Sequence, residues 1–163
     1  MALIKARSRG INLADTFAFS GTVSGAGGGK LLQIVTAEDV TELDLSTETF
    51  TDVGLSASIT PSATSSKVLV FWNIHGRLMA SSNGFGTRLV RGSTNIWSTV
   101  RPYYVFGDYV NERNAPSFNY LDTGISTTSA TTYKIQVNTS SNKNVLFNAN
   151  DIPSRLMLME ISA

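Results

Sequence analysis

The chain has 163 residues, a mass of 17.5 kDa and a formal net charge of +1, so one compact domain with an appendage is expected. A net charge this small makes nucleic acid and anionic membranes unexpected partners. The absence of cysteine excludes a disulfide framework, a thiolate nucleophile and cysteine metal ligands. No apolar run approaches the ~20 residues of a spanning helix, and no signal-peptide pattern occurs, so we expect a protein made in a cytoplasm and not inserted in a membrane.

Charged residues make up only 15% of the chain, and Ser, Thr and Asn take their place. Thr suits a pleated surface, whereas Ser and Asn compete with the hydrogen bonds of a helix. This composition predicts an all-β protein.

Residues 1–29 differ from the rest of the chain. They carry three bases against one acid and end in a glycine-rich run at 25–29, which is typical of a flexible joint. Apolar residues fall mostly at odd positions, as in a strand without a local partner. We therefore expect an arm that docks on a neighbouring subunit or another protein, with a disordered tail as the alternative. The predicted anchoring residues are Ile4, Lys5, Arg7, Arg9, Ile11, Leu13, Phe17 and Phe19.

After the arm, residues 31–37 predict a first strand, and residues 38–52 hold six of the twelve acids and no base. The simplest interpretation of the acidic stretch is a solvated loop and a charged edge strand. A calcium site is an alternative, although the spacing of a calcium loop is absent. A charged contact between the acidic stretch and the basic arm of a neighbouring subunit is the third interpretation.

Two strands are predicted next. Residues 53–59 are apolar at every second position, which indicates a half-buried strand. Residues 68–79 are apolar on both faces at their start, which indicates a central strand whose outer face packs against another subunit. Oligomerisation is therefore expected.

Residues 87–98 predict a hairpin around a four-residue loop at 92–95. Residues 101–116 form the most distinctive predicted loop, because it is rich in aromatic and charged residues. Tyrosine suits subunit interfaces and carbohydrate surfaces, so a core or interface role and a ligand role both remain open. The candidate receptor or interface residues are Trp97, Arg101, Tyr103, Tyr104, Phe106, Tyr109 and Arg113.

The rest of the chain continues the pattern of short strands. Strands are predicted at 117–123, at 131–138 with Tyr133, Ile135 and Val137 facing inward, around 143–149, and at 155–161 as a buried central strand. Eight to ten strands without helical periodicity predict an antiparallel, jelly-roll-like β-sandwich over residues 30–163.

Catalytic and metal-binding patterns are not found in the sequence. His75 is the single histidine, is expected on the polar face of its strand, and has no nucleophile and acid at a catalytic spacing. The glycine run fails the phosphate-loop pattern at Ser24 and Leu31. A carboxylate pair of a glycosidase cannot be read from spacing, yet a small sandwich offers little groove for one. We expect no enzyme activity, no cofactor and no metal.

Several segments together resemble a β-rich domain of tail-fibre-like and other virion proteins of tailed bacteriophages, of the marine and cyanophage type. The opening "GINLADTFAFSGTVSGAG" is similar to the attachment segment that often precedes such domains. The segments that carry the resemblance are "GKLLQIV" (29–35), "FTDVGLSASITPSATSSKVLV" (50–70), "RLVRGSTNI" (88–96), "SFNYLDT" (117–123), "TSATTYKIQV" (128–137) and "LMLMEISA" (156–163).

The resemblance implies a virion structural protein on the particle surface: a homotrimeric fibre or spike, held to tail or capsid proteins by its N-terminal arm. Members commonly have a Gly/Ser-rich stretch where this chain has "STVRPYYVFGDYVNERNAPS" (98–117), so the receptor is not carried over. A capsid decoration protein that clamps capsid subunits is the closest alternative. A receptor-recognition head that binds a host surface glycan is the second alternative function.

Overall fold

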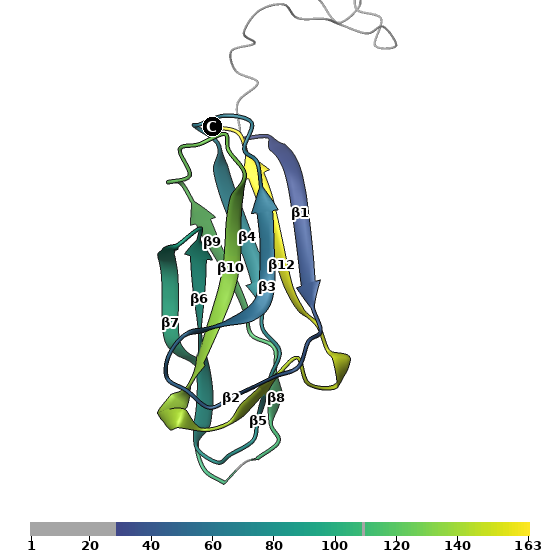
Figure 1. The fold of residues 1–163 in the computed structure, drawn as a ribbon, viewed down its shortest axis with the longest axis vertical. Coiled ribbons are helices and arrows are strands. Elements are labelled where there is room, and N and C mark those ends of the chain that lie inside the picture. Colours follow the sequence, from purple (N-terminus) through teal and green to yellow (C-terminus); the bar gives the residue numbers. More distant parts are fainter. Residues whose placement is uncertain (1–28, 109) are drawn as a thin grey trace, which may run out of the picture.

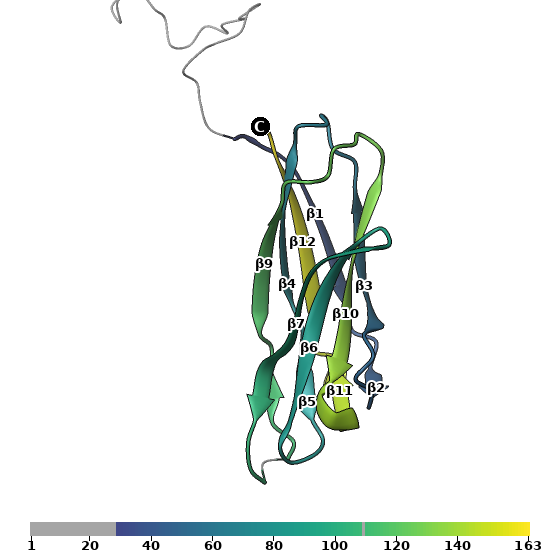
Figure 2. The same ribbon diagram turned by 90° about the vertical axis from the view of Figure 1, so that its left-hand side faces the viewer.

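The computed structural model describes residues 29–108 and 110–163, with the backbone alone for residues 101 and 102. The described chain forms antiparallel β-sheets, and its helical segments are two short 3-10 turns, Ser140–Asn142 and Ala149–Asp151. Two four-stranded sheets face each other (Figures 1 and 2). The first has the order β1-β12-β4-β9 and contains Leu31–Asp39, Ser154–Ile161, Lys67–Asn73 and Ser117–Asp122. The second has the order β3-β10-β6-β7 and contains Thr51–Ile59, Thr131–Thr139, Asn83–Arg91 and Thr94–Val105.

The chain passes from one sheet to the other at almost every connection. β1, β4, β9 and β12 belong to the first sheet, and β3, β6, β7 and β10 belong to the second. Eight antiparallel strands interleaved in this order form a jelly roll. The predicted fold class is therefore confirmed for the described residues.

A third, small sheet closes one end of the sandwich. Its order is β2-β11-β5-β8, from Leu43–Leu45, Val145–Phe147, Gly76–Leu78 and Arg113–Asn114. Each of its strands lies in the sequence between a strand of one main sheet and a strand of the other, so the two main sheets meet here. We call this the loop end, because the connections 40–50, 74–82, 106–116 and 140–153 gather at it (bottom of Figure 1). The opposite, terminal end holds residues 29–30, 162–163 and the connections 60–66, 92–93 and 123–130.

The core lies between the two main sheets and follows the period of two that a strand imposes. Val68, Val70 and Trp72 of β4 are at most 2% exposed and face inward, opposite Ile135 and Val137 of β10. The Trp72 indole nitrogen donates a hydrogen bond to Thr87 Oγ1 at 3.2 Å, so this large buried ring keeps no unpaired donor.

A buried carboxylate secures the serine-rich connection 60–66 at the terminal end. Glu160 is fully buried on β12, and its Oε1 accepts hydrogen bonds from the Ser62 amide, the Ser62 hydroxyl and the Ser66 hydroxyl at 2.6–2.7 Å. Gln33 Nε2 donates to Oε2 at 2.6 Å. Burial alone would raise the pKa of Glu160, but the donors outweigh burial and lower the pKa to about 2.

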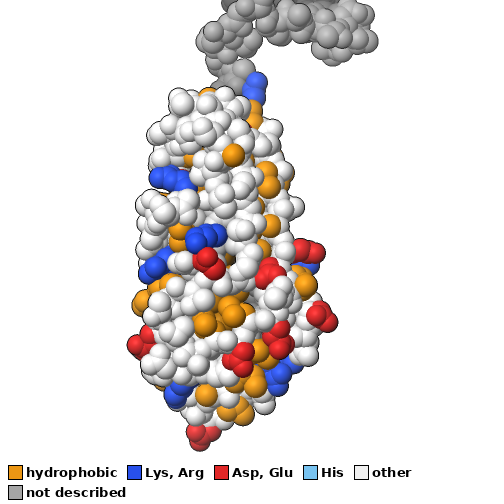
Figure 3. Space-filling model, viewed as in Figure 1, with side chains coloured by type: hydrophobic (Ala, Val, Ile, Leu, Met, Phe, Trp, Pro, Cys, Tyr) orange, Lys and Arg blue, Asp and Glu red, His pale blue; other side chains and the backbone are white. Residues whose placement is uncertain are grey.

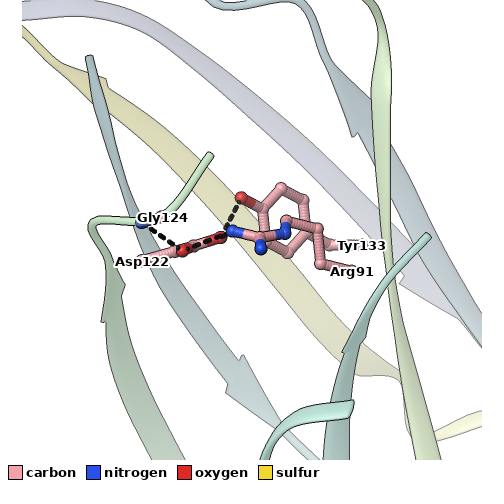
Figure 4. A network of polar contacts seen from close by, with 4 residues as sticks. All are labelled: Arg91, Asp122, Gly124 and Tyr133. Atoms are coloured by element: carbon pink, nitrogen blue, oxygen red, sulfur yellow. Dashed lines mark hydrogen bonds and ion pairs between the residues drawn. The ribbon is translucent and has the colours of Figure 1, made fainter. Parts of the chain in front are cut away.

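A second buried carboxylate joins the two sheets at the same end (Figure 4). Both oxygens of Asp122, at the end of β9, accept hydrogen bonds from Arg91 Nη1 of β6 at 2.8 Å. The hydroxyl of Tyr133, on β10, donates to Oδ2 at 2.7 Å, and the Gly124 amide donates to Oδ1 at 2.9 Å. Burial and the neighbouring carboxylate raise the pKa of Tyr133, so its phenol remains a donor.

Several sequence expectations on local structure are corrected. The hairpin loop at 92–95 is shorter than predicted, because Thr94 already pairs with Arg91. Gly92 begins the two-residue turn with φ +58°, a conformation that glycine adopts without steric cost. The strand predicted at 68–79 is broken after Asn73, and its second half, β5, belongs to the small sheet.

Candidate functional site at the loop end

The connections at the loop end are held together by hydrogen bonds between backbone groups and short polar side chains. The Ser82 amide donates to Gly107 O at 2.9 Å, and the Gly107 amide donates to Ser82 Oγ at 3.2 Å. Lys143 Nζ donates to Ser81 O at 2.7 Å. Arg77 Nη2 donates to Asn111 Oδ1 at 2.8 Å. Three connections that are distant in the sequence therefore form one ordered surface.

Left-handed backbone conformations concentrate at the same end. Seven of the eight described non-glycine residues with positive φ lie there. Asn and Asp adopt this conformation more readily than other non-glycine residues, since their side chains hydrogen-bond locally. The connection 140–153, which holds five of these residues, thus turns sharply several times without glycine. These residues are Ser82, Asn111, Ser141, Asn142, Asn148, Asn150 and Asp151.

An aromatic pair projects from this end. Phe106 is 80% exposed, and its ring centroid lies 4.7 Å from that of Tyr104. The Tyr104 hydroxyl donates to Ser82 O at 2.7 Å, and this hydrogen bond fixes the position of the Tyr104 ring. Val110, 52% exposed, adds a second apolar side chain on the same connection. An exposed aromatic ring on an ordered support can pack on a protein surface or on the apolar face of a sugar.

The other predicted loop residues are not brought to this pair. β7 extends to Val105, so Tyr103 and Tyr104 belong to a strand rather than to the predicted loop. Tyr103 packs on Phe85 of the core at 5.7 Å. Trp97, which is partly buried, lies against Trp72 and Phe118 at 5.2 and 5.6 Å and packs against the core. These two residues therefore serve the core.

Arg113 remains at the loop end but reaches another connection. Its Nη2 donates to Asn150 Oδ1 at 2.6 Å. The side chain of Arg101, Tyr109 and the predicted anchoring residues of the arm lie outside the described residues.

His75 is buried in the break between β4 and β5, at 4% exposure, rather than on an open polar face. Its amide donates to Ser154 Oγ at 3.0 Å, and Ser154 Oγ donates to Asn148 Oδ1 at 2.6 Å. Burial first, and then the charge of Arg113, lower the pKa of His75, which favours the neutral ring. Its contacts are structural.

The acidic stretch 38–52 runs along the loop end, and on the face shown in Figure 3 acidic side chains gather in the lower half. Several of these acids have structural partners: Glu48 Oε1 accepts the Ser141 amide at 2.9 Å, and Asp52 Oδ2 accepts Lys134 Nζ at 2.9 Å. Within the described residues no group of three or more His, Asp and Glu side chains could hold a metal ion. The calcium alternative has no support from this arrangement.

The contribution of residues 140–151 was not found by sequence reasoning. The connection supplies Lys143 and Asn150 to the surface and contains five of the left-handed residues. Its four asparagines, of which Asn142, Asn148 and Asn150 have positive φ, are the sequence signal that could have indicated it, because asparagine favours tight turns.

No protein-family model and no curated protein matches the sequence. Solved structures give partial likenesses. The structure of the Gt strain of infectious bursal disease virus matches with a TM-score of 0.47 and 15% identity, over 93% of this chain and 44% of that one. The VP2 subviral particle of the same virus matches with a TM-score of 0.47 and 13% identity, over 91% of this chain and 44% of that one.

A bacterial protein, dimeric latent PorU from Porphyromonas gingivalis, matches with a TM-score of 0.36 and 11% identity, over 87% of this chain and 14% of that one. This chain spans less than half the length of each of these three proteins. None of these likenesses assigns a function to the chain. Within the described residues, no helix is long and apolar enough to cross a membrane.

Proposed function

We propose that the protein is a non-enzymatic structural component of a tailed-bacteriophage virion, exposed on the particle surface as a trimeric fibre or spike head. The observation that carries the proposal is the opposite placement of two features. The arm joins the domain at the terminal end, where Lys30 O accepts the Ser162 amide at 2.9 Å. The ordered loop surface lies at the far end of the sandwich (Figure 1).

This arrangement suits a protein that is held at one end and makes contacts at the other. Anchoring through an extended arm relies on backbone hydrogen bonds and apolar side chains, both of which the sequence of residues 1–24 supplies. The sequence resemblance to phage virion proteins points in the same direction. Three copies on one fibre would raise the strength of a weak contact through effective concentration.

Particle incorporation tests the proposal. Particles assembled with a chain lacking residues 1–24 are expected to contain none of it, while the unmodified chain is found in purified particles by mass spectrometry. Normal incorporation of the truncated chain would refute anchoring by the arm, and absence of the unmodified chain would refute a virion role. Native mass spectrometry of the free protein is expected to give a trimer of the 17.5-kDa chain.

Copy number distinguishes the fibre from the capsid decoration protein. Quantitative mass spectrometry against the major capsid protein is expected to find few copies per particle. Hundreds of copies would favour decoration and would refute the fibre.

The exposed Phe106 ring favours a second candidate within the same protein class, a glycan-recognition role for the loop end. Phe106→Ala removes a side chain that is 80% exposed and leaves the core intact. Loss of binding on a glycan array by Phe106→Ala would support this role. Val100→Ala is the matched control, since Val100 is also exposed, at 64%, but lies on β7. Equal binding of Phe106→Ala and the unmodified protein to every glycan would refute it.

A further inference from the structure

The outer face of the first sheet, β1-β12-β4-β9, is apolar although no described element covers it. Register places Ile34, Met159, Leu69 and Leu121 in one row across the four strands. Ile34 is 52% and Leu121 is 44% exposed. Such a row on a sheet surface is typical of a site that another segment covers.

The next two rows form a groove of about 540 Å³ that continues toward the loop end. Its apolar part is built by Phe71, which is 40% exposed, and by Met157 beside it. Its far end is charged: Arg155 Nε lies 3.5 Å from Glu38 Oε2, and both side chains are more than 60% exposed. The groove therefore changes from apolar to charged along its length.

The outer face of the second sheet provides a contrast. The outward positions of β3 and β10 are polar, with Ser58 hydrogen-bonded to Thr132 at 2.7 Å and Asp52 paired with Lys134. Gln136 Nε2 also donates to Asp52 Oδ1 at 2.7 Å. A row of exposed apolar side chains across four strands is thus found on the first sheet, whereas the second sheet, among its described side chains, exposes the single large apolar side chain Val100, on its edge strand β7.

The arm has the composition that this face requires, in the same order. Passing from residue 28 toward residue 1, the chain presents apolar residues at 23, 19, 17, 13 and 11, interrupted by Gly21 and Asp15, and then the bases Arg9, Arg7 and Lys5. Passing from the terminal end toward the loop end, the face presents the row of Ile34, then Phe71 and Met157, and then the ion pair of Glu38 with Arg155.

We propose that, in the free protein, residues 9–23 of the arm fold back over the outer face of the first sheet of their own chain. The apolar residues cover Ile34, Phe71 and Met157, and the bases that follow them along the arm reach the row that holds Glu38. This self-contact would mask the arm until a particle protein displaces it. It concerns the free protein, and its test does not depend on whether the protein belongs to a virion.

The length of the arm is sufficient. Leu31 to Glu38 is eight strand residues, which span roughly 25 Å at ~3.3 Å per residue. Residues 9–24 can span up to about 50 Å when extended, which leaves room for the reversal at the glycine-rich run. Because the arm is tethered beside the sheet at Lys30, its effective concentration there exceeds that of a separate copy.

Crosslinking of engineered cysteines tests the proposal on the full chain, which has no cysteine of its own. A short bismaleimide is applied to the double variant Thr16→Cys with Thr36→Cys, whose second position lines the groove. The matched control pairs Thr16→Cys with Ser56→Cys, which is exposed on the outer face of the second sheet. We expect at least about ten times more intrachain crosslink with Thr36→Cys than with the control.

A groove variant makes the test specific. Adding Phe71→Asp is expected to reduce crosslinking at Thr36→Cys to the control level, whereas Thr128→Asp, on an exposed connection at the terminal end, leaves it unchanged. Circular dichroism shows whether the Phe71→Asp chain is folded, and Met157→Asp replaces it if it is not. Equal crosslinking at the two sheets, a mainly interchain product, or persistence in the folded groove variant would each overturn the proposal.

Discussion

Replacing Glu160 by Gln should destabilise the domain by an amount that depends on pH. The carboxylate accepts four hydrogen bonds, from Ser62, Ser66 and Gln33, and forms no ion pair with any described residue. In the variant, the new amide group faces the Gln33 Nε2 donor. Gln33 cannot turn its amide without losing the 2.7 Å hydrogen bond that Nε2 donates to Thr60 O.

The magnitude follows from the pKa of Glu160, which falls from its ordinary value of 4.5 to about 2 in the folded protein. At about 1.4 kcal/mol per unit, this difference contributes about 3 kcal/mol to the free energy of unfolding at neutral pH. The folded pKa is the lower one, so the contribution is complete above pH 4.5 and is lost as pH falls toward 2. About 2 kcal/mol of it is gone at pH 3.

Urea unfolding of the unmodified protein and Glu160→Gln at pH 7 and pH 3 measures this effect. We expect a difference in free energy of unfolding of about 3 kcal/mol at pH 7 that falls to about 1 kcal/mol at pH 3. Glu38→Gln is the control, since the exposed Glu38 is expected to contribute less than about 1 kcal/mol. A difference for Glu160→Gln that is the same at both pH values would refute the reasoning.

Substitutions at four further positions test the other structural assignments by urea unfolding at pH 7. Asp122→Asn removes the charge that pairs with Arg91 and should cost about 3 kcal/mol, and a cost below about 1 kcal/mol would show that the pair contributes little. Trp97→Ala should cost about 3 kcal/mol because the partly buried ring packs against Trp72 and Phe118 of the sandwich, whereas Phe106→Ala should stay within about 0.5 kcal/mol; the reverse order would contradict their placement. Gly92→Ala should cost about 1 kcal/mol, because alanine is strained at the φ of +58° that Gly92 has and open space around the site leaves no steric clash to add. Gly92→Asn should cost less, and equal costs for the two variants would contradict backbone strain as the cause.

The strand pattern could be predicted from the sequence because side chains alternate across a strand wherever the chain runs. Val53 and Leu55 on β3, and Tyr133 and Ile135 on β10, are buried as the alternation predicted. The apolar outer face of β4, noted in the sequence as a sign of oligomerisation, is exposed in the structure at Phe71. What covers that face stays a prediction.

The candidate site was predicted less well, because it is made by contacts between connections distant in the sequence. Phe106 was identified, but the sequence offered no sign that Trp97 and Tyr103 turn toward the core while Phe106 turns outward. Strand residues next to one another point to opposite faces, and the exact end of a strand decides which ones remain in a loop. The end of β7 at Val105 was not visible in the sequence.

The sequence by itself determined that this protein is built from antiparallel strands, since composition and a period of two are local properties of the chain. It also determined the contrast between a basic, apolar arm and a sandwich domain. Tertiary structure alone decided the order of the strands in the sheets, the meeting of four connections at one end, and the partners of Glu160 and Asp122. These features depend on pairings across many tens of residues, such as Ser62 with Glu160, and local pattern carries no information on which distant groups will meet.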